Sequence, residues 1–239
     1  MSTLTSLKTQ ERLLDRQAAN SIRQQIVNRT MPPGHRLLEA VLASELEVSR
    51  GTIRSALMQL SNEGLVRQVA FTKWEVAPAS VSEAWELYTL RSALEGLAAS
   101  LAAEYASAAE RQALLGVYAE LEAAARAGDR EAAADADFKL HKTIVAMSGH
   151  KRLIRDHERI ILQVRFQMTH IGFAPRDSKD LIEDHRMLTD AVVKGEVERA
   201  EQLARTHNST EVKRLLAANA RPPSPDALRL QNTREKDNG

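Results

Sequence analysis

Residues 32–66, PPGHRLLEAVLASELEVSRGTIRSALMQLSNEGLV, constrain the fold of this chain more than any other segment. Ser49 stands where the N-cap of a helix is expected, and Gly64 stands where that helix should end, just before Leu65. Apolar residues recur at helical spacing on both sides of Ser49, namely Leu42, Leu46 and Val48, then Ile53, Leu57 and Leu60. An ordinary helical hairpin with solvated arginines would explain the helices but not this order of caps and breaks. The segment therefore predicts a helix-turn-helix followed by the first strand of a wing.

Arginines mark one face of the second predicted helix. Arg50 and Arg54 are four residues apart, so they share a face of its first two turns. A guanidinium can read guanine through two parallel hydrogen bonds, which makes these residues candidates for contact with base edges. Hydroxyls and backbone amides at a helix start can position a phosphate. The candidates for that role are Ser49, Gly51 and Thr52, with Arg36 as a weaker one.

The segment resembles the winged helix-turn-helix of the GntR superfamily of bacterial transcription regulators, whose motif reads PxGxxL…LAxxLxVSRxPVRxALxxLxxEGL. The matching positions are Pro33, Gly34, Leu37, Leu42-Ala43, Leu46, Val48-Ser49-Arg50, Arg54, Ala56-Leu57, Leu60 and Glu63-Gly64-Leu65. The sequence departs from the motif at Gly51-Thr52-Ile53, which still allows a helix start. It departs further in residues 69–74, VAFTKW, where many members carry a glycine at the wing tip. The resemblance implies a DNA-binding domain that reads its site through the second helix.

Composition sets few limits on the partner of this chain. The formal net charge is +1, and residues 1–78 hold 10 Lys and Arg against 7 Asp and Glu, so DNA binding would depend on a few placed arginines. The absence of cysteine excludes disulfides and thiolate metal sites. No segment resembles a signal peptide or a membrane span, and we therefore expect a soluble, cytoplasmic protein with no membrane contact.

Breaks in the apolar pattern divide the 239 residues into five parts. We expect a polar arm over residues 1–10, a winged helix-turn-helix domain over 11–78, a linker over 79–81, an all-α domain over 82–219 and a disordered tail over 220–239. The first domain should open with a helix over residues 12–28 and place its wing strands near 65–70 and 73–76. The second should hold six helices, over residues 82–106, 108–127, 129–148, 150–171, 178–194 and 196–219, with Ser82 and Ser107 as candidate N-caps.

The second domain resembles the FCD effector domain of the FadR subfamily, and its six-helix count is typical of the VanR-like branch. Leu87-Tyr88-Thr89-Leu90-Arg91-Ser92-Ala93-Leu94-Glu95 matches the RxxLE pattern with which that domain opens. Aromatic residues make up only 4% of the chain, which suits helices that cross closely at small residues. The predicted fold class is therefore mainly α, with an N-terminal winged helix-turn-helix followed by an all-α six-helix bundle. The two resemblances together cover residues 10–219.

Three histidines and an aspartate occupy core positions of the predicted bundle. Asp137 and His141 are four residues apart on one helix, so their side chains leave the same face one turn apart. His185 and His207 each continue an apolar run on their own helix. If Gly195 is the turn between two antiparallel helices, these imidazoles lie roughly 15 and 18 Å from it and hence at a similar level.

Four buried polar groups in one bundle need partners, because unpaired buried polar groups are costly. One divalent transition ion would satisfy all four: three neutral nitrogens and a carboxylate oxygen suit zinc first, with nickel, manganese and iron as alternatives. A single core histidine usually has only a hydrogen-bond partner, but the set of four also resembles the DxxxH…H…H pattern of the FCD domain. His150, His157 and His170 have no such support, and His150 is expected at the surface or as a helix cap.

The expected effector is a small carboxylate-bearing metabolite, with an oxygen on the metal and its charge met by an arginine. Arg91 is the preferred partner because its helical position, between Leu87 and Leu94, points toward the bundle. Arg165 is the alternate partner. An internal pair between Arg91 and Glu95, at four-residue spacing, explains Arg91 at least as well.

Three classes of function are compatible with these features. A ligand-responsive transcription regulator explains both the DNA-reading helix and the metal pocket. It would be a homodimer on a near-palindromic operator, and a repressor released from DNA by its effector. The helix around residues 94–101 would supply the dimer interface, unless its apolar stripe is only intrachain core.

A metal-dependent enzyme that uses the Asp/His₃ site is the alternative, but neither a general base of the HExxH kind nor a phosphate-binding glycine loop accompanies the site. A protein-binding module with a degenerate first domain is the third possibility. The intact face of Ser49, Arg50 and Arg54 argues against it.

Overall fold

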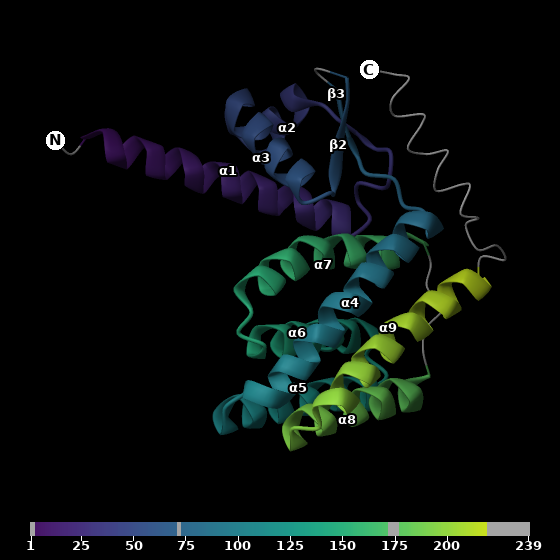
Figure 1. Cartoon of the computed structure of the whole chain (residues 1–239). Helices are drawn as coiled ribbons and strands as arrows, with labels where there is room; N and C mark the ends of the chain where they lie inside the picture. The colour runs from purple at the N-terminus through teal and green to yellow at the C-terminus, as the bar shows by residue number, and fades with distance from the viewer. Residues whose placement is uncertain (1–2, 71–72, 172–176, 219–239) are drawn as a thin grey trace. The chain divides into compact units, whose positions relative to one another are not determined.

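The computed structural model describes residues 3–70, 73–171 and 177–218, which form two compact units. The first unit extends to Glu83 and also includes the second half of helix α7, from Ile161. The second unit holds residues 84–160 and the helices beyond residue 176. The predicted fold class is confirmed, because a winged helix-turn-helix unit is followed by an all-α unit (Figure 1).

The first unit combines helices with a small antiparallel sheet. Its elements in chain order are α1 (Thr3–Val27), β1 (Arg36–Leu37), α2 (Glu39–Glu45), α3 (Arg50–Asn62), β2 (Val66–Ala70) and β3 (Lys73–Val76). The strands pair in the order β1-β3-β2, and Arg36 lies opposite Glu75. The sequence does not predict β1, because two residues between a turn and a helix are too few to show an alternating pattern.

Helix α1 begins at Thr3, well before the predicted start at Arg12, so residues 3–10 of the predicted arm are helical. No glycine or proline interrupts that polar stretch, and the helix therefore continues through it. The core of the first unit is formed by apolar residues of α1, α3 and the sheet, among them Ala18, Ile22, Ile26, Ile53, Leu57, Leu60, Leu37 and Trp74. Phe166 of α7 belongs to the same core.

The turn and the ends of α3 have the local geometry that the sequence predicts. The Oγ of Ser49 caps α3 by accepting a hydrogen bond from the backbone N–H of Thr52 at 3.0 Å. Gly64 follows α3 with a φ of +73°, in the left-handed region that glycine enters most easily. A Cβ at Gly64 would also lie 2.5 Å from the side chain of Gln163, so this position combines a strained angle with a close approach.

The helices after the winged helix-turn-helix lie close to those predicted, and all but the second half of α7 and the first residues of α4 belong to the second unit: α4 (Val81–Tyr105), α5 (Ala108–Ala127), α6 (Arg130–Met147), α7 (Lys151–Ile171), α8 (Ser178–Lys194) and α9 (Val197–Ala218). Ser107 caps α5 as predicted, in a reciprocal capping box with Glu110. The predicted cap at Ser82 is wrong. Helix α4 starts earlier, and the Oγ of Ser80 accepts from the backbone N–H of Glu83 at 3.1 Å.

Small residues allow the helices of the second unit to pack closely. Helix α4 contributes alanines to the core, where they meet leucines of α5 and α6 and residues of α8 and α9; the members include Ala99, Ala102, Ala103, Leu114, Leu121, Leu140, Leu188 and Ala204. The last turns of α4 and α8 are joined by one side chain of α5. Arg111 donates to the carbonyls of Val192 and Val193 from Nη1, to Ala103 from Nη2 and to Ala106 from Nε. These carbonyls lie at or just beyond the ends of α4 and α8, where a helix supplies few donors of its own.

Two predicted features lie outside the described residues, namely the wing tip at 71–72 and the tail over 220–239. Within the described part of the chain, none of the helices combines the length and the apolarity needed to cross a membrane.

Candidate metal centre and DNA-binding face

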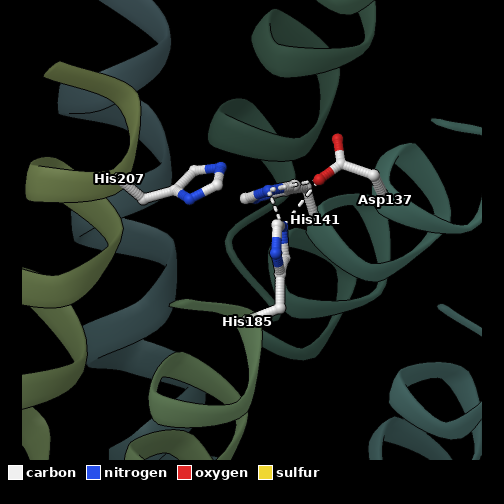
Figure 2. A group of neighbouring side chains, drawn as sticks. All are labelled: Asp137, His141, His185 and His207. Atoms are coloured by element: carbon white, nitrogen blue, oxygen red, sulfur yellow. Dashed lines mark hydrogen bonds and ion pairs between the residues drawn. The ribbon is translucent and has the colours of Figure 1, made fainter. Parts of the chain in front are cut away.

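The structure brings together the aspartate and the three histidines singled out in the sequence (Figure 2). Asp137 and His141 extend from α6, His185 from α8 and His207 from α9, and the four ligand atoms all lie within 4.8 Å of one another. The three imidazoles are buried, and the side chain of Asp137 is 15% exposed. Residues separated by up to 70 positions along the chain therefore form one cluster, the Asp/His₃ cluster.

The separation of two imidazoles in the Asp/His₃ cluster suits a shared ion, whereas the carboxylate of Asp137 lies at hydrogen-bond distance from one of them. The Nε2 atoms of His141 and His185 are 3.3 Å apart. Two nitrogens bound tetrahedrally to one zinc at about 2.0–2.1 Å would be separated by roughly 3.3 Å. Oδ1 of Asp137 lies 2.6 Å from Nε2 of His185 and 3.7 Å from Nε2 of His141. The ring of His207 completes the group, with its centroid 4.9 Å from that of His141 and 4.6 Å from that of His185.

In His141 and His185 the Nδ1 atom, which points away from the cluster, has a hydrogen-bond acceptor next to it. Nδ1 of His185 lies 2.7 Å from the carbonyl oxygen of Leu181, and Nδ1 of His141 lies 2.8 Å from Oε2 of Glu95. Both partners are acceptors, so each Nδ1 carries a proton and each ring directs its Nε2 into the cluster. These two nitrogens and the carboxylate of Asp137 face one another. A proton or a metal cation among them would make that arrangement favourable.

The protonation states favour a metal ion as that cation. Burial lowers the pKa of His141, and the negative charge of Glu95 only partly offsets this effect. Burial also lowers the pKa of His207 well below its ordinary value, and the neighbouring imidazoles of His185 and His141 lower it further. Burial would raise the pKa of Asp137, but the imidazoles of His185 and His141 hold it below its usual range. A carboxylate beside imidazoles whose pKa burial lowers, as at His141 and His207, is a ligand set that a divalent transition ion can bind.

Arg91 and Glu95 form a buried ion pair beside the Asp/His₃ cluster. Nε of Arg91 donates to Oε1 of Glu95 at 2.7 Å, and both side chains are 2% exposed. An internal Arg91–Glu95 pair was one of the two roles predicted for Arg91 from the sequence, and the structure contains it. Nη2 of Arg91 is also buried, and no hydrogen-bond partner for it occurs among the described residues. The arginine therefore has a donor left for a ligand.

Glu95 has further partners that the sequence did not reveal. Nε2 of His157 lies 2.9 Å from Oε1, and Nδ2 of Asn208 donates to Oε2 at 2.8 Å. His157 was not expected at any site, and Asn208 was not considered, although it follows His207 directly. Burial would raise the pKa of Glu95, but the guanidinium of Arg91 and then His141 hold it well below its ordinary value.

The other histidines and the alternate arginine lie elsewhere. His150 caps α7, because its Nδ1 accepts from the backbone N–H of Leu153 at 3.1 Å. Arg165 lies in the part of α7 that groups with the first unit, so the structure does not group it with the Asp/His₃ cluster.

The candidate DNA-binding residues lie on the exposed side of the first unit. Ser49, Arg50 and Gly51 are exposed at the start of α3, Thr52 is half-buried, and Arg36 is exposed on β1. Arg54 is held by a carboxylate of α2: its Nη2 and Nε donate to the two oxygens of Glu39 at 2.9 and 3.1 Å.

Trp74 lies on the wing strand β3, as predicted, and its side chain is only 6% exposed. Its indole N–H donates to Glu39 at 3.2 Å, so one carboxylate of α2 binds both the tryptophan of β3 and an arginine of α3.

An exposed helix-turn-helix with a wing, joined to a helical unit that encloses an Asp/His₃ cluster, defines a DNA-binding regulator with a separate helical domain. The chain belongs to the GntR family of bacterial regulatory proteins. Residues 14–70 match the family described as "Bacterial regulatory proteins, gntR family", and residues 86–210 match the FCD domain.

Relatives of known class support the same assignment. The chain is 30% identical over 207 residues to the "Probable D-xylose utilization operon transcriptional repressor" of Paenarthrobacter nicotinovorans, with 84% of this chain and 89% of that protein covered. It is 26% identical over 191 residues to the HTH-type transcriptional regulator YdhC of Bacillus subtilis (strain 168), covering 79% and 84% of the two chains. The solved structure of E. coli McbR/YncC has the same fold, with a TM-score of 0.69, 21% identity and 86% of this chain and 98% of that chain covered. The protein is a transcription regulator, and the enzyme alternative finds no support among these matches.

Proposed function

We propose that this GntR-family regulator is a homodimeric repressor that releases its operator when a small carboxylate binds beside a metal ion. The observation that carries the proposal is the presence, in one chain, of an exposed recognition helix and a buried Asp/His₃ cluster with an arginine next to it. A sensor needs both a DNA-reading surface and a ligand site, and each of the two units supplies one.

Arg50 and Arg54 are the proposed base-reading residues, with Ser49, Gly51 and Thr52 at phosphate and Arg36 as a weaker phosphate contact. The pair with Glu39 gives the Arg54 guanidinium a fixed orientation before DNA arrives. Its Nη1 is not part of that pair and faces no competition from Glu39. One short helix reads too few bases for useful specificity, and two recognition helices on a near-palindromic operator would remedy this.

Helix α4 is the proposed dimer interface, as expected from the sequence, with Leu97 of the expected segment and Leu90 one to two turns before it. Leu94 packs inside the chain against Ala98, Val145 and Leu153, so it belongs to the intrachain core. Leu90 and Leu97, in contrast, are 47% and 42% exposed. With the exposed Ala93 they are spaced by three and four residues and form one apolar stripe, the α4 stripe.

The Asp/His₃ cluster is the proposed site of one divalent ion, zinc in the first instance and nickel, manganese or iron otherwise. Four protein ligands complete a tetrahedral site, so an oxygen of the effector would bind an ion that takes five or six ligands, as nickel, manganese and iron do and as zinc can. Buried polar atoms near the cluster lack a partner among the described residues, namely Nη2 of Arg91, Oδ1 of Asn208 and Oγ1 of Thr189. Such atoms support a polar effector, with Arg91 at its carboxylate. Arg165 is not retained for this role.

The switch requires the effector to prefer one arrangement of the dimer, because a ligand with equal affinity for both states shifts nothing. We infer release of DNA on ligand binding. Support comes from the relative named as the repressor of a D-xylose utilization operon. That name concerns a sugar, and a search for the effector should therefore include neutral sugars as well as acids.

Replacing Arg50 or Arg54 with alanine should weaken operator binding by about 1–3 kcal/mol and flatten the preference among sequences. The measurement is fluorescence anisotropy with DNA from the region upstream of the gene, against a scrambled duplex. Arg126→Ala, which removes an exposed arginine of α5, is the control and should bind like the parent. If both variants of α3 also bind like the parent, the base-reading assignment is wrong.

Replacing Leu90 and Leu97 together with glutamate should convert the dimer to a monomer, because the change places charges in the α4 stripe. Light scattering at micromolar concentration reports the mass. Val41→Glu changes an apolar side chain of α2 that is exposed to a similar extent, 47%, and should leave a dimer. A parent protein that is monomeric under these conditions contradicts the dimer itself.

Replacing His185 and His207 together with alanine should remove bound metal and the stability that the metal confers. A ligand at about 1,000 times its Kd stabilises the native state by about 4 kcal/mol, so the parent should gain on this scale from zinc and the variant should not. Elemental analysis and thermal unfolding with and without zinc measure the two effects. His35→Ala, at an exposed histidine of the first unit, is the control. A parent prepared without chelators that holds no metal and gains no stability from zinc would refute the site.

An organic acid should raise the unfolding temperature of the metal-loaded protein, and Arg91→Lys should reduce that response. Lysine keeps a positive charge beside Glu95 but loses the planar fork, at a cost of about 1.5–3 kcal/mol in effector binding. The measurement is a thermal-shift screen of organic acids and neutral sugars, with Arg186→Lys at an exposed arginine as the control. Stabilisation by a sugar and by no acid would overturn the carboxylate proposal and the role of Arg91.

A further inference from the structure

We propose that Glu95 is a positioning residue of the metal centre: it holds the proton of His141 on Nδ1 and so directs the Nε2 lone pair of that ligand toward the ion. This inference rests on the proposed metal site and deepens it. Glu95 lies on α4, outside the Asp/His₃ cluster, and acts through His141 of α6.

The hydrogen bonds of Glu95 account for its whole accepting capacity. A carboxylate has about four lone-pair sites, and Glu95 faces four donors, two on each oxygen. Oε1 lies near Nε of Arg91 at 2.7 Å and Nε2 of His157 at 2.9 Å. Oε2 lies near Nδ1 of His141 and Nδ2 of Asn208, both at 2.8 Å. Glu95 therefore has no lone pair left for the ion, and its role toward the metal is indirect.

An ionised carboxylate can only accept, so the histidine nitrogen that faces it must carry a proton. At 2.8 Å from Oε2, Nδ1 of His141 is the protonated nitrogen. The neutral ring then keeps its lone pair on Nε2, which lies 3.3 Å from Nε2 of His185 within the Asp/His₃ cluster. Histidine ligands of metals commonly donate their second N–H to a carboxylate or a carbonyl, which fixes both the tautomer and the ring orientation.

Each of the three histidine ligands is treated differently by the fold. His185 has its Nδ1 fixed by the backbone carbonyl of Leu181, and no described residue accepts from Nδ1 of His207. Only His141, among these ligands in the described chain, depends on a side chain of another helix for its tautomer. A substitution at Glu95 therefore changes the orientation of the ligand His141 while leaving that ligand in the chain.

Glu95→Gln is the informative variant because it keeps the shape and removes the charge and part of the accepting capacity. A glutamine amide has one oxygen for four donors, and its NH₂ group must face either Arg91 or His141. Facing His141, it requires Nδ1 to accept, which moves the ring proton to Nε2 and blocks the metal lone pair. We expect the affinity for Co²⁺, followed by its visible absorption, and for Zn²⁺, measured by chelator competition, to fall about 10- to 100-fold.

The tautomer itself is the second readout, and it needs no metal. Ring-¹⁵N NMR of metal-free protein at neutral pH distinguishes a protonated Nδ1 from a protonated Nε2, and His141→Gln identifies the signal. The parent should show His141 protonated on Nδ1. Glu95→Gln should move the proton to Nε2 or mix the two forms, and Glu95→Asp, which restores an anion, should return it toward Nδ1 and recover part of the metal affinity.

Two further variants keep the test decisive. Glu211→Gln removes another buried carboxylate, one paired with Arg214 on α9, and should change neither the tautomer nor the metal affinity. Glu95→Gln leaves the charge of Arg91 buried without its partner and can prevent folding. Arg91→Met combined with Glu95→Gln removes both charges together and should show the same tautomer shift in a folded protein.

The outcomes separate this inference from the proposed metal site. If the parent binds neither ion but its His141 tautomer depends on Glu95, the metal proposal fails while the hydrogen-bond role of Glu95 remains. If the parent binds metal and the folded Glu95 variants keep both the Nδ1 proton and the parental affinity, Glu95 does not position His141 and the inference is overturned.

Discussion

A carboxylate buried among packed helices is stable only if its lone pairs are matched, and the second unit depends on that condition at Glu95. Its donors come from α4, α6, α7 and α9, so four helices meet at one side chain that is 2% exposed. Truncating a single partner in such a network leaves a charge uncompensated, which is more damaging than removing a complete pair. The position of α6, and with it that of His141 and Asp137, therefore depends on contacts made outside the Asp/His₃ cluster.

The first unit uses a carboxylate in a related way. Glu39 of α2 binds the guanidinium of Arg54 through two hydrogen bonds and also accepts from the indole of Trp74. An arginine on an exposed helix normally samples many rotamers, and part of the entropy that Arg54 would lose at the proposed DNA contact is already lost in this pair. In each unit a glutamate thus orients a neighbouring side chain that is proposed to bind a ligand. Glu39 orients Arg54, the proposed DNA contact, and Glu95 orients His141, the proposed metal ligand.

The sequence predicted the parts of the structure that local periodicity determines. The caps and breaks around α3 and the spacing of Asp137, His141, His185 and His207 follow from helical repeats, and the structure brings those four residues together. His157 was missed because its partner lies 62 positions away and a lone histidine on an amphipathic helix carries no signal of its own. Glu95 was seen only as the neighbour of Arg91, because spacing within one helix cannot reveal donors from three others. The sequence left open whether the leucines of residues 94–101 belong to an interface or to the intrachain core, since periodicity alone does not show which stripe the chain covers. Leu97 is exposed, whereas Leu94 packs inside the chain.

Helix α7 carries a practical consequence for taking the protein apart. Its first half, with His157, belongs to the second unit, while Phe166 in its second half is 1% exposed within the core of the first. A fragment that stops after the winged helix would lose Phe166 from its core, and the complementary fragment would present that ring to water. No single cut of the chain therefore yields two intact units. A truncation between residues 70 and 86, where the match to the GntR family ends and the match to the FCD domain begins, would leave a first unit that lacks part of its core.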